Sequence, residues 1–134
     1  MKYMLIMNSP RDGYDQYMSW PKEILEANGT FMETITKKMD AAGELVGTVG
    51  LASPKQAKLV RAGKDGKPIT DGVFPESKEF LAGYWIVDVE SAERAYEIAA
   101  EVSTAPGATV IVDGKPVDYF WIEVRAVMGS RKDM

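Results

Sequence analysis

The sequence predicts an α+β fold of the ferredoxin-like type, in which an antiparallel sheet carries two helices on one face. Three observations lead to this prediction. The apolar segments follow the order β-α-β, then a hairpin, then β-α-β. Both helical segments place apolar residues at helical spacing, and two Asp-Gly pairs stand between short β-prone arms. The 134 residues are of a size usual for one domain, so a single domain is expected over residues 1–134.

The first part of the chain reads as strand, helix, strand. Lys2–Asn8 is a compact apolar run that a Ser-Pro-Arg-Asp-Gly loop follows. Tyr14–Ala42 has a helical pattern, with Ser19 expected as the N-cap. The Asn28-Gly29 pair predicts either a kink or a split in this helix. Glu44–Leu51 is rich in glycine but leans toward a strand.

The second part repeats the order around two hairpins. Residues 58–72 form the first expected hairpin, turning at Asp65-Gly66. Phe80–Val89 is a long strand, and Ser91 is expected to cap the helix that follows. Residues 108–127 are expected to form a second hairpin whose return arm continues into the last strand.

The last strand is amphipathic. One face is expected to carry Phe120, Ile122, Val124, Ala126 and Met128, and the other Tyr119, Trp121, Glu123, Arg125 and Val127. The second face is too aromatic to remain in water, and pairing with a second copy would cover it. A homodimer is therefore expected.

Composition excludes several kinds of site. The chain has no Cys and no His, so thiolate nucleophiles, Ser-His-Asp triads and His- or Cys-ligated metals are impossible. No transition metal and no cofactor are expected. The net charge of −4 and the scattered basic residues argue against nucleic acid as a partner. No apolar run has the length of a membrane span or the character of a signal peptide, so a cytoplasmic protein is expected.

One motif resembles a known family. Residues 71–79 read DGVFPESKE before an apolar strand, and residues 122–127 read IEVRAV. These segments are similar to hallmarks of YCII-related proteins, in particular those with the DGPF domain. The resemblance extends over nearly the whole chain and implies a dimeric α/β-barrel of two ferredoxin-like subunits packed sheet to sheet.

The chain also departs from the family pattern. Val73 stands where the family has Pro, and Pro75 where Ala is usual. More distant YCII proteins use an Asp-His pair, which a chain without His cannot carry. The resemblance therefore strengthens the fold prediction and weakens the case for catalysis, and whether the protein is an enzyme stays open.

Candidate ligand-binding residues come from the motif and the strand after it. Asp71, Glu76 and Lys78 would form the rim of a pocket whose floor is the sheet, with Tyr84 on the strand beside it. The alternative is that Asp71 only opens a turn and the charged residues are a solvated connector.

The last strand supplies the other candidates. Glu123 and Arg125 lie two residues apart on the face that also carries Trp121. Either the two charges fix the register of a dimer, or Arg125 binds an anionic group. Asp71 and Glu123 are the candidate proton carriers if any reaction is catalysed.

Two functions of different classes follow. The first is binding of an unidentified small molecule in a cleft beside the sheet, with possible weak acid–base chemistry. The second, implied by the linkage of DGPF-type domains to sigma-factor genes, is a non-catalytic regulatory or scaffold module with a protein partner in transcription. A monooxygenase or isomerase, as in other dimeric α/β-barrels, is a weaker third because no His supports it.

Overall fold

The computed structural model describes residues 1–72, 79–117 and 120–129. Its main sheet consists of β1 (Lys2–Ser9), β2 (Leu45–Gly50), β5 (Phe80–Asp88) and β8 (Ile122–Ala126). The helices are α1 (Gly13–Met18), α2 (Lys22–Ala41), η1 (Pro54–Gln56, a 3-10 turn) and α3 (Ala92–Val102). Two small hairpins are formed by β3 (Lys58–Ala62) with β4 (Pro68–Gly72), and by β6 (Val110–Val112) with β7 (Lys115–Val117).

The main sheet has the strand order β2-β5-β1-β8, and every neighbouring pair is antiparallel. The strand after the first helical region, β2, does not pair with β1, because β5 lies between them. This split β-α-β arrangement confirms the predicted α+β, ferredoxin-like fold.

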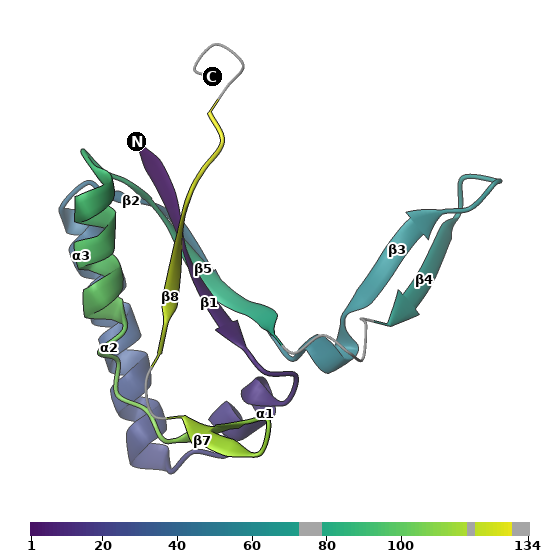
Figure 1. Ribbon diagram of the computed structural model, residues 1–134, viewed down its shortest axis with the longest axis horizontal. Coiled ribbons are helices and arrows are strands. Elements are labelled where there is room, and N and C mark those ends of the chain that lie inside the picture. The colour runs from purple at the N-terminus through teal and green to yellow at the C-terminus, as the bar shows by residue number, and fades with distance from the viewer. Residues whose placement is uncertain (73–78, 118–119, 130–134) are drawn as a thin grey trace.

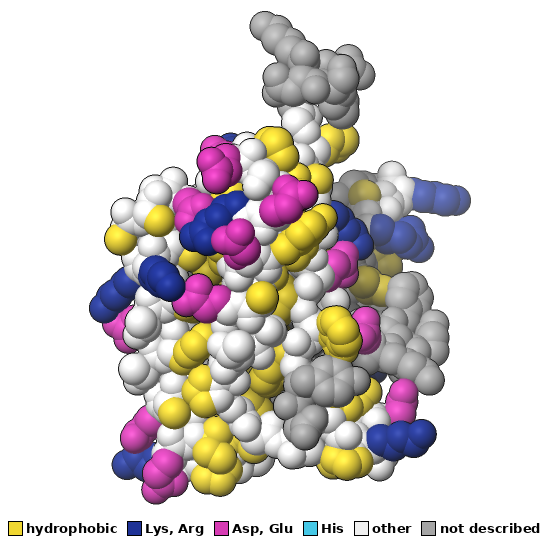
Figure 2. Space-filling model, turned by 60° about the vertical axis from the view of Figure 1, so that its left-hand side comes forward, with side chains coloured by type: hydrophobic (Ala, Val, Ile, Leu, Met, Phe, Trp, Pro, Cys, Tyr) yellow, Lys and Arg dark blue, Asp and Glu magenta, His cyan; other side chains and the backbone are white. Residues whose placement is uncertain are grey.

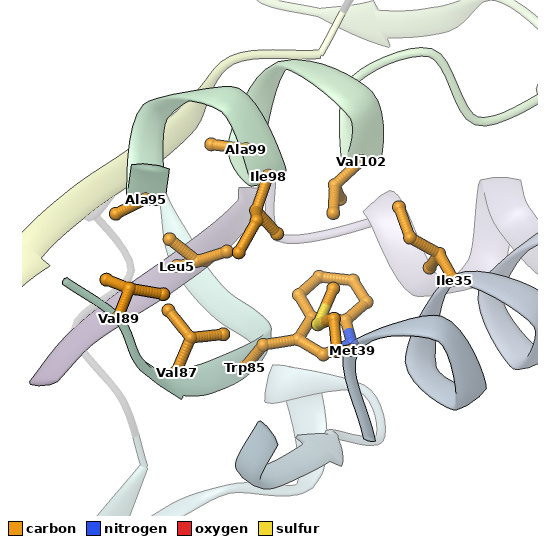
Figure 3. Packing of buried hydrophobic residues seen from close by; sticks show 10 residues of the cluster. All are labelled: Leu5, Ile35, Met39, Trp85, Val87, Val89, Ala95, Ile98, Ala99 and Val102. Carbon is orange, nitrogen blue, oxygen red and sulfur yellow. The ribbon is translucent and has the colours of Figure 1, made fainter. Parts of the chain in front are cut away.

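Helices α2 and α3 cover one face of the sheet, and the core lies between them (Figures 1 and 3). The central strands supply Leu5 and Val87, both fully buried, because alternate residues of a strand point to the same face. The core consists of Leu5, Ile35, Met39, Trp85, Val87, Val89, Ala95, Ile98, Ala99 and Val102. Ile122 and Val124 of β8 pack against this cluster, as the predicted alternation requires.

The helical pattern over residues 14–42 is confirmed, but it forms two helices, α1 and α2, which are separated at residues 19–21 and not at Asn28-Gly29. Ser19 does not cap α2; its hydroxyl donates to the carbonyl of Asp15 inside α1 instead. Pro21, with φ −52° and ψ 143°, occupies the N-cap position of α2. Asn28 does not split the helix, since α2 continues through it, and its buried side chain donates to the Pro106 carbonyl at 2.9 Å.

The β6–β7 hairpin turns at Asp113 and Gly114, both with positive φ (52° and 74°), which is the geometry that Asp-Gly favours in two-residue hairpins. The predicted continuation of its return arm into the last strand is wrong. β7 ends at Val117, and β8 is a separate strand of the main sheet. The first predicted hairpin is confirmed as β3–β4, and all ten of its strand residues are exposed (Figure 1).

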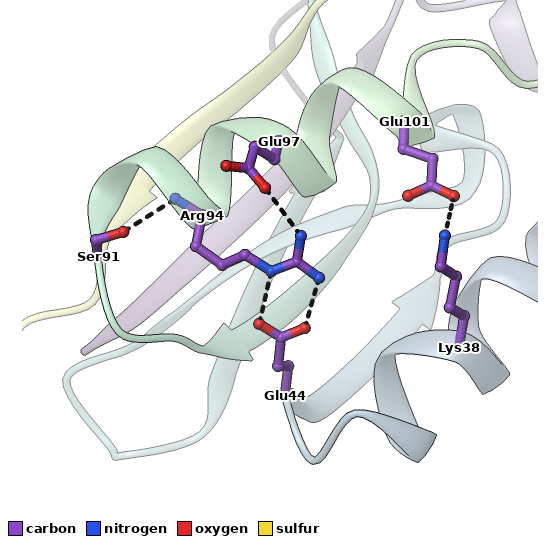
Figure 4. A network of polar contacts seen from close by, with 6 residues as sticks. All are labelled: Lys38, Glu44, Ser91, Arg94, Glu97 and Glu101. Carbon is purple, nitrogen blue, oxygen red and sulfur yellow. Dashed lines mark hydrogen bonds and ion pairs between the residues drawn. The ribbon is translucent and has the colours of Figure 1, made fainter.

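An ion-pair network joins the start of β2 to α3 (Figure 4). The Arg94 guanidinium donates to both carboxylate oxygens of Glu44, at 2.9 and 2.8 Å, and to Glu97 at 3.1 Å. Ser91 accepts from the Arg94 backbone N–H, which confirms its predicted capping role. Acidic and basic side chains are interspersed over the upper part of the face in Figure 2. In the described part of the chain, no helix is long and apolar enough to cross a membrane.

Candidate functional site

A pocket of about 880 Å³ lies at one end of the main sheet, where β1 ends and where β5 and β8 begin. Its walls come from distant parts of the chain: α1 and α2, the β6–β7 hairpin, and Gly50, Leu51, Ala52 and Pro54 at and after the end of β2. The floor is formed by the sheet, including Met7, Ala82 and Ile122. A pocket that draws on so many elements exists only in the folded chain.

Aromatic side chains from a short segment form one wall of the pocket. Tyr14 and Tyr17 belong to α1, and Trp20 follows in the turn before α2. The rings of Tyr17 and Trp20 meet edge to face with centroids 5.1 Å apart, an arrangement that aromatic quadrupoles favour. Trp20 is 9% exposed, and Phe120 also lines the pocket.

Polar contacts hold this wall in place. The Gln16 side chain donates to the Ile111 carbonyl at 2.9 Å and accepts from the Ile111 N–H at 2.7 Å. Asp15 pairs with Lys55 of η1 at 2.6 Å. Consecutive residues of α1 therefore fasten it to β6 and to η1. The aromatic wall has a fixed position as a result.

Two carboxylates stand at the pocket. Glu79 precedes β5, and Glu123 lies on β8. Glu123 is paired across the sheet with Ile6 and forms an ion pair with Arg125, whose register partner is Met4. The Glu123 side chain is 40% exposed and the Arg125 side chain 72%, so this pair is at the surface of the chain.

The structure brings some of the predicted site residues together. Trp121 and Glu123 both line the pocket, and Arg125 contacts Glu123. Trp121 is 83% exposed, so most of its side chain is accessible at the mouth.

Other predicted site residues lie elsewhere. Asp71 is on β4 of the exposed β3–β4 hairpin, where its carboxylate accepts from the Gly72 N–H at 2.8 Å. Tyr84 is on β5, opposite Ile6 and on the sheet face away from the helices. Neither Asp71 nor Tyr84 lines the pocket of the chain itself, and their roles in ligand binding stay predictions. Glu76 and Lys78 lie outside the described residues.

The sequence analysis missed the aromatic wall. Tyr14, Tyr17 and Trp20 recur every third residue, a spacing that brings side chains to one side of a helix. That spacing was the available signal.

Among the described residues that line the pocket, the acidic groups are carboxyl and phenol oxygens. The described residues contain no group of three or more acidic side chains able to hold a metal ion. The groups at the pocket able to exchange a proton are the carboxylates of Glu79 and Glu123 and the hydroxyls of Tyr14 and Tyr17. The rest of the lining is mainly apolar, so the geometry suits binding better than it suits a reaction.

Comparison with known proteins gives two findings. The family model described as "YCII-related domain" matches residues 1–113. A protein of Rhizobium meliloti (strain 1021), named "Uncharacterized protein R00369", is 27% identical over 102 residues, which are 76% of this chain and 82% of that protein. The family match includes the aromatic wall at residues 14–20 and ends before β8, so Trp121 and Glu123 lie beyond it.

Proposed function

The chain belongs to the YCII-related family, and from that premise we propose that it binds a small molecule with an aromatic, largely apolar body in the pocket beside α1. The observation that carries the proposal is the pocket itself. Its volume of about 880 Å³ is within the range usual for ligand sites, and a few polar groups interrupt an apolar lining. The rigid attachment of α1 supports the proposal, because a preformed site loses little free energy on binding.

The second part of the proposal is that the protein is a homodimer. On the sheet face away from the helices, Met4 is paired with Ile86, and Ile6 with Tyr84. Four large side chains, three of them purely apolar, therefore form two neighbouring rows; Ile6 is already buried within the chain, and Met4, Tyr84 and Ile86 are half-buried. A second copy placed with its own sheet against this face would cover both rows.

Weak acid–base chemistry belongs to the same proposal. Glu123 would be the proton carrier, because it is the predicted catalytic candidate that lines the pocket. Asp71 would take such a role only if a second copy brought its hairpin to the site.

One observation favours the alternative of a regulatory or scaffold module with a protein partner in transcription. The β3–β4 hairpin exposes Leu59, Val60 and Ile69 at 40%, 62% and 43%. Three exposed apolar side chains on one projecting hairpin are a feature of surfaces that meet another protein.

A ligand screen followed by tryptophan fluorescence tests the first function. Two of the three tryptophans, Trp20 and Trp121, line the pocket, whereas Trp85 lies in the core. Binding is expected to change the emission in a saturable way, and Trp121→Phe is expected to remove part of that change. A pull-down on the same preparation tests the alternative. A stoichiometric protein partner, together with no saturable response to any aromatic compound, would overturn the small-molecule proposal.

A further inference from the structure

The charged side chains at the pocket have one sign. Among the described residues that line it, Glu79 and Glu123 are the charged ones, and no Lys or Arg belongs to the lining. The neighbouring cation Lys55 is directed to Asp15. A ligand in the pocket therefore meets two carboxylates and several aromatic rings in the lining.

The two carboxylates differ in their own partners. Glu123 is held by Arg125, which is largely exposed and lies on the same face of β8. Glu79 is exposed, with no ion pair to another described residue. At least one carboxylate therefore has its full acceptor capacity left for a ligand.

Aromatic rings add a second source of attraction for positive charge. A cation is attracted to the face of Trp or Tyr because the ring quadrupole is negative there. Tyr14, Tyr17 and Trp20 line the wall, and Trp121 stands beside Glu123 at the mouth. Carboxylates next to aromatic faces are the combination that recognises organic ammonium groups.

We infer that the pocket selects an aromatic or otherwise apolar amine in its protonated form, with the ammonium group at Glu79 and Glu123 and the apolar body against the wall formed by Tyr14, Tyr17 and Trp20. This inference rests on the proposed binding function and names its ligand class. A carboxylate or phosphate of the same shape is disfavoured, because its charge would be brought beside two like charges.

One neighbouring group works against this selectivity. Arg11, in the loop between β1 and α1, is half-buried, and its Nη1 has no hydrogen-bond partner among the described residues. Its side chain does not line the pocket. If ligand entry drew the guanidinium inward, the pocket would prefer an anion instead. Arg11→Gln is therefore the variant that tests whether the pocket prefers an anion.

Three probes with one apolar body and different head groups test the inference. Phenylbutylamine is a cation at neutral pH, phenylbutanol is neutral, and phenylbutyrate is an anion. Titrations against the native protein, followed by tryptophan fluorescence and by calorimetry, are expected to show the amine binding about tenfold more tightly than the alcohol. The carboxylate is expected to bind more weakly than the alcohol.

Variants locate the effect. The double variant Glu79→Gln with Glu123→Gln is expected to reduce the preference for amine over alcohol to within about threefold. The matched control is Glu90→Gln with Glu93→Gln, which removes the same net charge from exposed positions outside the pocket and leaves the preference unchanged. Arg125→Gln is expected to tighten amine binding a few-fold, because the Arg125 guanidinium no longer competes for Glu123.

The results that would overturn the inference differ from those that would overturn the binding function. Equal binding of amine and alcohol, unchanged by the Gln variants, would reject the amine class and leave an apolar binding pocket. Preferred binding of phenylbutyrate, lost in Arg11→Gln, would replace the amine by an anion. If no probe and no other aromatic compound gave a saturable response with folded protein, both the inference and the proposed function would fail.

Discussion

The side-chain amide of Gln16 pairs with both peptide groups of Ile111, as a neighbouring β-strand would. Its Nε2 donates to the Ile111 carbonyl at 2.9 Å, and its Oε1 accepts from the Ile111 N–H at 2.7 Å. The two residues are 95 positions apart in the chain. One amide therefore joins α1 to the outer edge of β6 and fixes two walls of the pocket relative to each other.

Replacing this amide tests the attachment. Gln16→Ala is expected to lower the free energy of unfolding by about 1 kcal/mol, because two partly exposed hydrogen bonds return to water. The Ile111 amide proton is expected to exchange faster with solvent, and affinity for pocket ligands is expected to fall. Gln56→Ala in η1 is the control, since no hydrogen bond of the Gln56 side chain is found among the described residues. Unchanged exchange at Ile111 would show that the hairpin is held by other contacts.

Local patterns sufficed to predict the sheet and its main helices. The period of two in residues 122–126 assigns Ile122 and Val124 to the core, which the structure confirms. Hydrophobic spacing and the Ser91 cap likewise predicted α3. Such features are visible in sequence because neighbouring residues produce them.

The pocket could not be predicted in the same way. Asn28 reads as a helix breaker from its neighbours, yet it is buried because the carbonyl of Pro106, 78 positions away, accepts its hydrogen bond. Ser19 reads as a cap, yet Pro21 takes that position. Contacts between distant segments decide these outcomes, and local propensity does not contain them.

Two glycines are expected to respond oppositely to the same change. Gly29 lies in the exposed interior of α2, and a Cβ built there meets nothing within 4 Å. Gly29→Ala is therefore expected to raise the free energy of unfolding by about 0.5–1 kcal/mol. A Cβ on Gly107 would approach Cη2 of Trp20 to 2.8 Å. Gly107→Ala is therefore expected to lower the free energy of unfolding by about 1–3 kcal/mol.

Urea unfolding of both variants measures the difference. Trp20 lines the pocket, so Gly107→Ala is also expected to change its fluorescence emission, whereas Gly29→Ala is not. Equal stability of the two alanine variants would mean that Trp20 moves away from residue 107 without cost, and would contradict a rigid aromatic wall.

The Glu44–Arg94 pair predicts a dependence of stability on pH. The hydrogen bonds from Arg94 hold the pKa of Glu44 below its ordinary value of 4.5. Because the folded pKa is lower than the unfolded one, the stabilisation is present above about pH 4.5 and is lost as the pH falls through the folded pKa. The Glu44 side chain is 16% exposed, so solvent screens the pair only partly.

Glu44→Gln is expected to lower the free energy of unfolding by about 1–2 kcal/mol at pH 7, and to lower it by less as the pH falls below about 4.5. The control is Glu33→Gln, since Glu33 pairs with Lys37 on the exposed surface of α2, where no measurable change is expected. A difference in the free energy of unfolding between the native protein and Glu44→Gln that stays constant from pH 7 to pH 3 would contradict this prediction.

A partly buried hydrogen bond connects the sheet to α2. The Nε1 of Trp85 donates to the hydroxyl of Thr36 at 3.1 Å, and Trp85 is 5% exposed. Thr36→Val keeps the shape of the side chain but leaves the indole N–H without an acceptor. The free energy of unfolding is therefore expected to fall by about 1–3 kcal/mol. Thr36→Ser keeps the hydroxyl and is expected to lower the free energy of unfolding by less than Thr36→Val does. If Val and Ser variants unfold at the same urea concentration, the hydrogen bond contributes nothing.

The proposed homodimer predicts that one charge on the open sheet face separates the subunits. Ile86 is half-buried on that face, opposite Met4, in a row that a second copy would cover. Ile86→Glu would place a carboxylate in the interface without a partner, so the variant is expected to be a folded monomer in light scattering at micromolar concentration. Tyr96→Glu is the control, because Tyr96 is 55% exposed on α3, on the helical side of the sheet, and this variant should remain dimeric. A monomeric native protein would contradict the dimer outright. A dimeric Ile86→Glu variant would show that the interface lies on another surface. An unpaired charge is costly only where a partner excludes water from it.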